Sequence, residues 1–223
     1  MGKNSLKIYF AGDLFDAKDL GGNLMLADAI NRLSGSRYCV MLPQDGECEV
    51  KERTSQSIRD ADFKLLFECD CVVANFDGTD LDSGTVAEFC FAKSVDMPTV
   101  LLRTDFRDSG DHTLPDGEPW NLMCSHFPRT AVLHINGMVR YHHCREYAQD
   151  ISALLTAYYN SIAQEIIQKL DSVCAMDSWL KEDMLYSQYC NTVKSIGGTL
   201  GKLFNEASLP ELIEHKKQSG LFK

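Results

Sequence analysis

The sequence predicts an α/β domain in which helices cover both faces of an open, doubly wound, parallel sheet of five strands, followed by a C-terminal helical extension. Two observations carry this prediction. Over roughly residues 6–137, short apolar runs alternate with amphipathic segments of helical length. From about residue 145 onward the apolar runs stop, and apolar residues recur at helical spacing toward the end of the chain.

Five apolar runs have the length and composition of buried strands, and each is bounded by residues typical of turns. Runs that are apolar on both faces indicate strands of a parallel sheet that is covered on both sides. The predicted strands are residues 7–13, 37–45, 70–79, 97–105 and 130–137.

The segments between these runs predict helices over residues 23–35, 55–69 and 84–94. In the first helix, the apolar residues at helical spacing end at Gly35, a residue common at helix ends. Strands that alternate with helices form βαβ units, which place the strands parallel and the helices on both faces. This arrangement is called flavodoxin-like or Rossmann-like.

Two further segments complete the predicted organisation. Residues 105–128 lack periodicity and are rich in Gly, Pro, Asp and Ser, and a loop of this length in a compact domain is usually functional or disordered. We therefore expect an α/β domain over residues 1–145 and a helical extension over residues 146–223. The helical pattern of the extension is interrupted near Met176 and at Gly197-Gly198.

The composition of the chain disfavours several classes of partner. The 223 residues carry 32 acidic and 22 basic side chains, a formal charge of −10, which disfavours nucleic acid and anionic membrane surfaces as partners. The first residues lack the apolar core of a signal peptide, and no window approaches the ~20 apolar residues of a membrane span. The nine cysteines lack paired spacing, so they read as reduced thiols rather than as disulfides or a metal site. We expect a soluble, cytoplasmic protein.

The stretch FDGTDLDSGTVAEF, which begins at residue 76, concentrates carboxylates where a ligand is expected. Asp77, Asp80 and Asp82 follow the predicted strand 70–79, and ligands of open parallel sheets bind beyond the carboxyl ends of the strands. Asp82 or Ser83 also has the position and chemistry of a cap for the next helix.

Glu88 lies further along the same stretch, among apolar neighbours that leave it little solvent. A carboxylate in such surroundings is desolvated unless it faces a cavity. An ion pair with a buried arginine, or a single exposed face of the helix, would also accommodate it. We favour a cavity at Glu88.

Three segments, IYFAGDLF, FDGTDLDSGTVAEF and EPWNLM, together resemble the nucleoside 2-deoxyribosyltransferases over roughly residues 6–135. The resemblance implies that Glu88 is a nucleophile that attacks C1′ of a 2′-deoxynucleoside and forms a covalent deoxyribosyl enzyme, which a second base then attacks. In the family pattern D-x-G-x-x-x-E a glycine follows the aspartate by two positions. This sequence has Asp82, Gly84 and Glu88 at these positions, with Ser83 before the glycine, and in some relatives the glycine is shifted by one position.

The resemblance also implies roles for other carboxylates and a phenol. Tyr9 matches a tyrosine that orients the nucleophile, Asp62 matches an aspartate that contacts the base and can protonate it, and Asp82 matches a residue that binds the deoxyribose hydroxyls. Glu88, Tyr9 and Asp62 are thus the expected catalytic residues. Taken alone, Tyr9 would equally be a core tyrosine and Asp62 a solvated surface residue.

The remaining matches concern substrate binding. Asn121 and Met123 match residues that reach into the site of a neighbouring subunit, the asparagine toward the 5′-hydroxyl, so the resemblance implies a homo-oligomer. Phe15 matches an aromatic residue that packs on the base, and Leu14 stands where relatives often have tryptophan. Neither a metal nor an organic cofactor is needed, because the covalent enzyme stores the sugar.

Alternatives remain at this stage. Attack of water on the intermediate would make the protein an N-glycosidase of 2′-deoxynucleosides, and related glycosidases that act on nucleoside 5′-monophosphates have a serine at the position of Asp82. A carboxylate there would repel a 5′-phosphate, so Asp82 favours an unphosphorylated nucleoside. A non-catalytic sensor that binds a nucleotide-derived ligand on the same fold is the third alternative.

Overall fold

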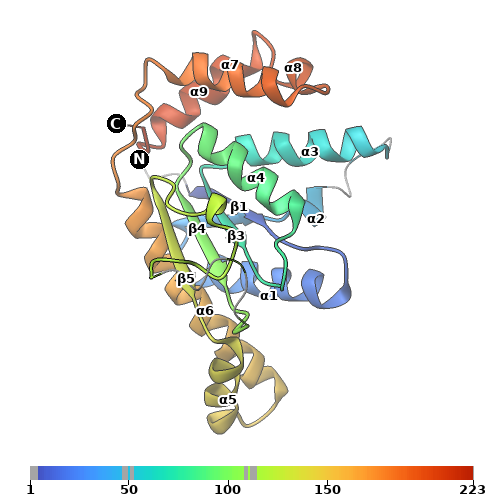
Figure 1. Cartoon of the computed structure of the whole chain (residues 1–223), viewed down its shortest axis with the longest axis vertical. Coiled ribbons are helices and arrows are strands. Elements are labelled where there is room, and N and C mark those ends of the chain that lie inside the picture. The colour runs from blue at the N-terminus through green and yellow to red at the C-terminus, as the bar shows by residue number, and fades with distance from the viewer. Residues whose placement is uncertain (1–4, 47–49, 51–52, 108–109, 111–114, 223) are drawn as a thin grey trace.

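A computed structural model describes residues 5–46, 50, 53–107, 110 and 115–222 (Figure 1). The strands are β1 (Leu6–Ala11), β2 (Tyr38–Met41), β3 (Cys71–Asn75), β4 (Thr99–Arg103) and β5 (Thr130–His134), and the helices are α1 (Ala17–Leu33), α2 (Pro43–Gly46), α3 (Ser55–Glu68), α4 (Ser83–Ser94), the 3-10 turn η2 (Leu122–Cys124), α5 (Gly137–Tyr147), α6 (Ile151–Cys174), α7 (Leu185–Ile196), α8 (Leu200–Leu203) and α9 (Ser208–Gln218).

The five strands form one sheet in the order β2-β1-β3-β4-β5, and every neighbouring pair is parallel. The predicted flavodoxin-like fold with C-terminal helices is therefore confirmed. Chain order reverses between β1 and β3, where Tyr9 lies beside Val72 in register. Ligands of such sheets bind at this reversal, beyond the carboxyl ends of the strands.

Helices cover both faces of the sheet (Figure 1). On one face α1 and α6 enclose a core that includes Ile30 and Ile166, and on the other face α3 and α4 enclose a core that includes Phe67 and Phe89. Helix α6 is the first helix beyond residue 145, yet its buried side chains belong to the core of the sheet. The exact domain boundary stays a prediction.

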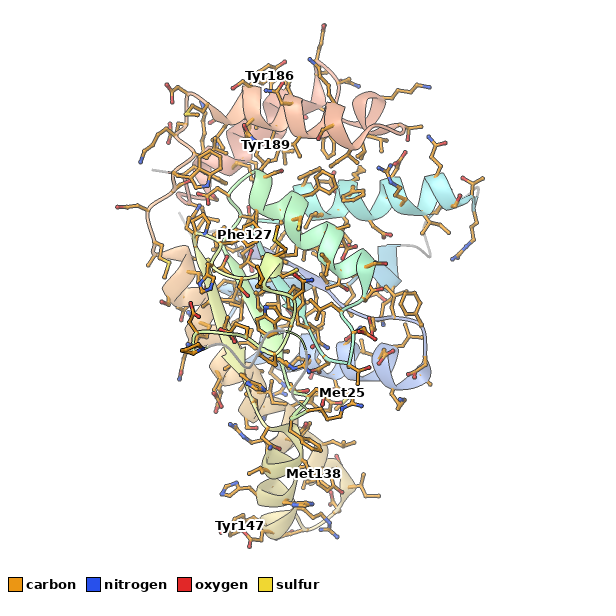
Figure 2. All side chains as sticks on the ribbon, in the orientation of Figure 1. Met25, Phe127, Met138, Tyr147, Tyr186 and Tyr189 are labelled. Atoms are coloured by element: carbon orange, nitrogen blue, oxygen red, sulfur yellow. The ribbon has the colours of Figure 1, made fainter. Side chains whose placement is uncertain are left out.

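Helices α7, α8 and α9 form a further layer over α3 and α4 (Figure 1). Tyr189 of α7 points into the core and is fully buried, whereas Tyr186 of the same helix points away from it (Figure 2). As the sequence predicts, the helical pattern is interrupted near Met176 and at Gly197-Gly198, since α6 ends at Cys174 and α7 ends at Ile196.

Two element boundaries differ from the predicted ones for local reasons. Helix α1 begins at Ala17 rather than at residue 23, because the side chain of Asp16 accepts hydrogen bonds from the first free N–H groups of the helix. Strand β2 ends at Met41, because Pro43 cannot donate to the ladder and instead starts α2.

The predicted loop over residues 105–128 contains η2, and residues 108–109 and 111–114 of it lie outside the described residues. Across the part of the chain that the structure describes, no helix is both long and apolar enough to cross a membrane.

Candidate active site

Glu88 and Tyr9 form the centre of the candidate site. Asp82 starts α4 by accepting a hydrogen bond from Thr85 N, and this start places Glu88 on the side of the helix that faces β1. Tyr9 of β1 is fully buried, and its hydroxyl donates a hydrogen bond of 2.5 Å to Glu88 Oε1. The hydrogen bond joins β1 to α4, the helix that follows β3, and the strand order reverses between β1 and β3.

The surroundings of Glu88 favour its neutral form. Burial raises the pKa of Glu88 to about 7, the hydrogen bond from Tyr9 opposes the rise, and the charges of Asp62 and Asp82 add to it. The pKa of Tyr9 lies well above its ordinary value, first because of burial and then because of the charge of Glu88. Tyr9 therefore stays a hydrogen-bond donor while Glu88 titrates near neutral pH.

Asp62 lies close to this pair. It is half-buried on α3, and its charge raises the pKa of both Tyr9 and Glu88. The fold thus brings together Tyr9, Asp62 and Glu88 from β1, α3 and α4, although they are spread over some eighty positions of the chain. The alternative of an arginine partner for Glu88 finds no support among the described residues, where Tyr9 is the partner.

Asp82 caps α4 with one carboxylate oxygen and leaves the other oxygen available. Its Oδ2 accepts from Thr85 N at 2.7 Å and from Thr85 Oγ1 at 2.9 Å. No donor among the described residues contacts its Oδ1. Asp82 is therefore held in a fixed orientation with one carboxylate oxygen available.

The other two aspartates of the stretch differ in their surroundings. Asp77 is occupied by the loop after β4, because its carboxylate accepts from Thr104 N, Thr104 Oγ1 and Asp105 N. Asp80 is exposed. Asp77 thus orders the loop that follows β4, and its oxygens already have partners.

Asp13 is a neighbouring carboxylate that the sequence reasoning did not select. Burial raises its pKa first, and the charges of Asp82, Asp19, Asp77 and Asp16 raise it further. The available signal was its position directly after the apolar run IYFAG, at the carboxyl end of the first strand. Asp13 and Asp82 therefore share one acidic region beside the reversal of strand order.

The expected substrate-binding residues outside this cluster lie toward solvent. Phe15 is 77% exposed and Met123 is 73% exposed, while Leu14 is half-buried. Asn121 caps η2 by accepting from Met123 N at 3.0 Å and is itself exposed. Among the described contacts, none joins Asn121 or Met123 to Glu88 of the same chain.

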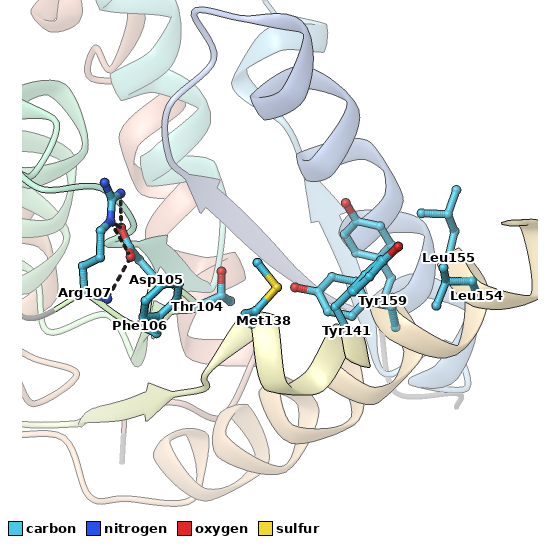
Figure 3. Close-up of a pocket in the computed structure, with 11 residues that line it drawn as sticks. Thr104, Asp105, Phe106, Arg107, Met138, Tyr141, Leu154, Leu155 and Tyr159 are labelled. Carbon is cyan, nitrogen blue, oxygen red and sulfur yellow. Dashed lines mark hydrogen bonds and ion pairs between the residues drawn. The ribbon is translucent and has the colours of Figure 1, made fainter. Parts of the chain in front are cut away.

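A cavity of about 710 Å³ lies elsewhere, between the loop after β4 and helices α5 and α6 (Figure 3). Tyr141, Tyr158 and Tyr159 line it together with Met138 and aliphatic side chains, and Arg107 pairs with Asp105 at one end. None of the predicted site residues lines this cavity. The one carboxylate among the lining residues of this cavity, Asp105, is paired with Arg107. We place the candidate site at Glu88, because glycosidic chemistry uses a pair of carboxylates and Glu88 lies near Asp62 and Asp82.

Within the described ranges, no group of three or more His, Cys, Asp or Glu side chains is arranged to hold a metal ion. The candidate site is thus built from carboxylates and one phenol. Such a set can supply a nucleophile, a proton donor and hydrogen-bond acceptors for hydroxyl groups.

The fold and the site define a class: a parallel α/β domain with a desolvated glutamate held by a strand tyrosine at the reversal of strand order. The sequence model of the family described as nucleoside 2-deoxyribosyltransferase matches residues 8–123, more than half of the chain. The chain belongs to this family. The match includes all eight predicted site residues.

Solved structures with similar folds share about a fifth of their residues with this chain. A conserved protein from Enterococcus faecalis V583 is 22% identical, with 75% of this chain and 98% of that chain covered and a TM-score of 0.47. A 2-desoxiribosyltransferase from Leishmania mexicana is 21% identical, covering 56% and 89%, with a TM-score of 0.44. A 2-deoxyribosyltransferase from Bacillus psychrosaccharolyticus is 19% identical, covering 66% and 95%, with a TM-score of 0.43. No curated protein matches the chain.

Proposed function

We propose that the protein transfers 2-deoxyribose between nucleobases through a covalent deoxyribosyl ester of Glu88, with retention of configuration at C1′. Membership of the family supports this activity. The single observation that carries the mechanism is the 2.5 Å hydrogen bond from Tyr9 to a desolvated glutamate at the carboxyl edge of the sheet.

In the first step the bond from C1′ to the leaving base breaks as a carboxylate oxygen of Glu88 bonds to C1′. The transition state resembles an oxocarbenium ion, which the negative charge of Glu88 stabilises before it forms the ester. Tyr9 holds Oε1 by donating a hydrogen bond to it, so that Oε2 is directed to the sugar. Asp62 gives a proton to the departing base, because a neutral base leaves more readily than an anion.

In the second step another base attacks C1′ on the opposite side and releases Glu88. Asp62 takes up the proton that this base loses as its bond to C1′ forms, which returns the site to its initial state. Two inversions give net retention. Burial places the pKa of the proposed nucleophile at about 7, so Glu88 gains its charge as the pH rises through the neutral range.

The substrate-binding residues have proposed roles of their own. The free Oδ1 of Asp82 accepts from a deoxyribose hydroxyl, and Phe15 with Leu14 packs on the base. Asn121 and Met123, which lie on the surface, complete the site of a neighbouring subunit, so the active form is a homo-oligomer. The proposed substrates are a 2′-deoxynucleoside and a free nucleobase.

Incubation with 2′-deoxyinosine and adenine, followed by chromatography, tests the activity. Formation of hypoxanthine together with 2′-deoxyadenosine supports the transferase. Hypoxanthine without 2′-deoxyadenosine identifies an N-glycosidase. If neither product forms, and pyrimidine 2′-deoxynucleosides with pyrimidine bases also stay unchanged, the result contradicts both enzymes and favours a sensor.

Intact-mass measurement tests the covalent step. Wild-type protein mixed with 2′-deoxyinosine alone should gain the mass of one deoxyribosyl group, and Glu88→Ala should gain none. An adduct of equal yield on the Glu88→Ala variant contradicts the proposed nucleophile. Sedimentation that shows a fully active monomer contradicts the proposed role of Asn121 and Met123.

A further inference from the structure

The C-terminal helices α7 to α9 contact the outer sides of the two helices that carry Asp62 and Glu88 (Figure 1). These helices begin far beyond residue 123, where the family match ends, so the match assigns them no role. Their contacts with α3 and α4 include hydrogen bonds as well as apolar packing.

The turn between α7 and α8 contacts the N-terminal half of α3 through Asp60. The side chain of Asp60 is buried, and its Oδ2 accepts from Thr199 N at 2.6 Å and from Thr199 Oγ1 at 2.7 Å. Arg59 donates to Asp60 Oδ1 at 2.8 Å and to the carbonyl of Ile196, the last residue of α7, at 2.6 Å. Burial raises the pKa of Asp60, but the hydrogen bonds from Thr199 and the charge of Arg59 outweigh this effect. The pKa of Asp60 therefore lies below its ordinary value.

Gly198 allows this close approach. Its φ of +64° is in the left-handed region, and a Cβ on it would lie 2.5 and 2.7 Å from the two carboxylate oxygens of Asp60. Any larger residue would push the turn away from α3. Two other glycines of the extension lack this contact, because a Cβ on Gly197 or Gly201 would meet nothing within 4 Å.

Helix geometry connects Asp60 to the candidate site. Residues two apart on an α-helix are separated by about 200° around the axis, so they lie on nearly opposite sides. Asp60 faces the turn at Thr199, and Asp62 faces the region of Tyr9 and Glu88. A shift of α3 at Asp60 therefore changes the distance from Asp62 to Glu88.

Helix α7 also binds the end of α4. Ser94, the last residue of α4, shares a hydrogen bond of 3.2 Å with Thr192, and its carbonyl accepts from Gln188 Nε2 at 2.7 Å. Phe63 of α3 packs edge-to-face against Phe91 of α4 at 5.3 Å between ring centroids. Helix α7 and the turn that follows it therefore contact both α3 and α4, and α3 and α4 also pack against each other.

We propose that the Gly198-Thr199 turn sets the position of α3 through Asp60 and thereby the separation of Asp62 from Glu88. Asp60 and Thr199 are positioning residues, because they act on the site through α3 and do not touch substrate. This inference rests on the proposed transferase function for its kinetic consequence, and the positioning of α3 is measurable without it.

Three glycine variants separate the positioning role from a general effect on the extension. Gly198→Ala introduces both a left-handed φ for alanine and a clash with Asp60, Gly197→Ala introduces the strain without the clash, and Gly201→Ala introduces neither. Gly198→Ala should lower kcat for base exchange by about 10- to 100-fold, the effect of a catalytic group displaced by about 1 Å. Gly201→Ala should stay close to wild type in kcat, and Gly197→Ala, at φ 72° and ψ −139°, measures the effect of backbone strain in the turn without the clash and should lower kcat less than Gly198→Ala.

The pH profile is the readout that a merely structural role would not move. Since the charge of Asp62 raises the pKa of Glu88, moving Asp62 away should shift the midpoint of kcat/KM against pH to lower values. Thr199→Val removes one donor to Asp60 with little change in volume and should give the same direction of shift, so the inference stays testable if Gly198→Ala fails to fold.

Hydrogen exchange measured by mass spectrometry decides the positioning independently of activity. In Gly198→Ala and Thr199→Val, amides of residues 55–68 should exchange faster than in Gly197→Ala, Gly201→Ala and wild type. If wild-type protein neither transfers deoxyribose between bases nor hydrolyses nucleosides, the proposed function is wrong, and hydrogen exchange alone decides the inference. If Gly198→Ala and Thr199→Val match Gly197→Ala in α3 exchange and in the pH midpoint, the inference is overturned.

Discussion

Substituting Tyr9 by phenylalanine should move the pH dependence of catalysis to higher pH. The change removes the hydroxyl that donates 2.5 Å to Glu88 Oε1 and leaves the buried ring in place. The hydrogen bond stabilises the charged carboxylate, so its loss raises the pKa of Glu88 above about 7. The proposed mechanism needs the ionised glutamate, so the active fraction at neutral pH should fall.

The magnitude follows from the strength of the bond. A hydrogen bond to a charged group contributes about 1.5–3 kcal/mol, and a pKa unit corresponds to about 1.4 kcal/mol, so the midpoint should rise by about one to two pH units. A wild-type midpoint near 7 would then become a midpoint of about 8 to 9. At pH 6 the variant should be about 10- to 100-fold slower in kcat/KM, and part of this loss should be recovered at pH 9.

Initial rates of exchange between 2′-deoxyinosine and adenine, measured from pH 5 to 10 at low nucleoside concentration, report the pKa values of the free enzyme. Tyr158→Phe is the matched control, because Tyr158 is a half-buried tyrosine that lines the other cavity. The reasoning is refuted if the Tyr9→Phe midpoint equals that of wild type or lies below it.

The remaining predictions concern stability and the placement of the site. Glu88→Gln should abolish exchange and raise the free energy of unfolding at pH 8 by at most on the order of 3 kcal/mol, because the folded protein holds the pKa at about 7 against an ordinary 4.5. This gain should vanish at pH 4, where both states bind the proton, and equal urea stabilities of variant and wild type at pH 8 would contradict it. Lys216→Met should cost about 3–5 kcal/mol in urea unfolding, since Lys216 is fully buried beside the buried Asp70; a loss below about 1 kcal/mol would show that the pair is worth no more than a surface contact. Tyr159→Phe should leave base exchange at the wild-type rate, and a large loss would move the site to the cavity of Figure 3.

Much of the fold could be predicted because parallel sheets have a distinct local signature. Strands buried on both faces must be apolar throughout, so runs such as the one around Tyr9 stand out from the periodic helices between them. The helix before β3 was predicted because its apolar residues recur at helical spacing. The start of α1 was missed, because the capping role of Asp16 depends on the conformation of a single residue and not on a pattern.

The candidate site was predicted only in part. Glu88 attracted attention because a carboxylate among apolar neighbours is costly, and Asp82 because of its place after a strand. Asp13 was missed, since one aspartate after a strand has no pattern of its own. Its raised pKa arises from charges that approach it only in the folded chain.

Local pattern along the chain was enough to predict the strands from their apolar runs, most covering helices from their helical spacing, and the residues to expect at one edge of the sheet from the family motifs. Which side chains meet depends on folding, because the contacts of Tyr9 with Glu88 and of Thr199 with Asp60 join segments that are far apart along the chain. Burial and charge act through space, so the raised pKa of Glu88 could not be read from local pattern.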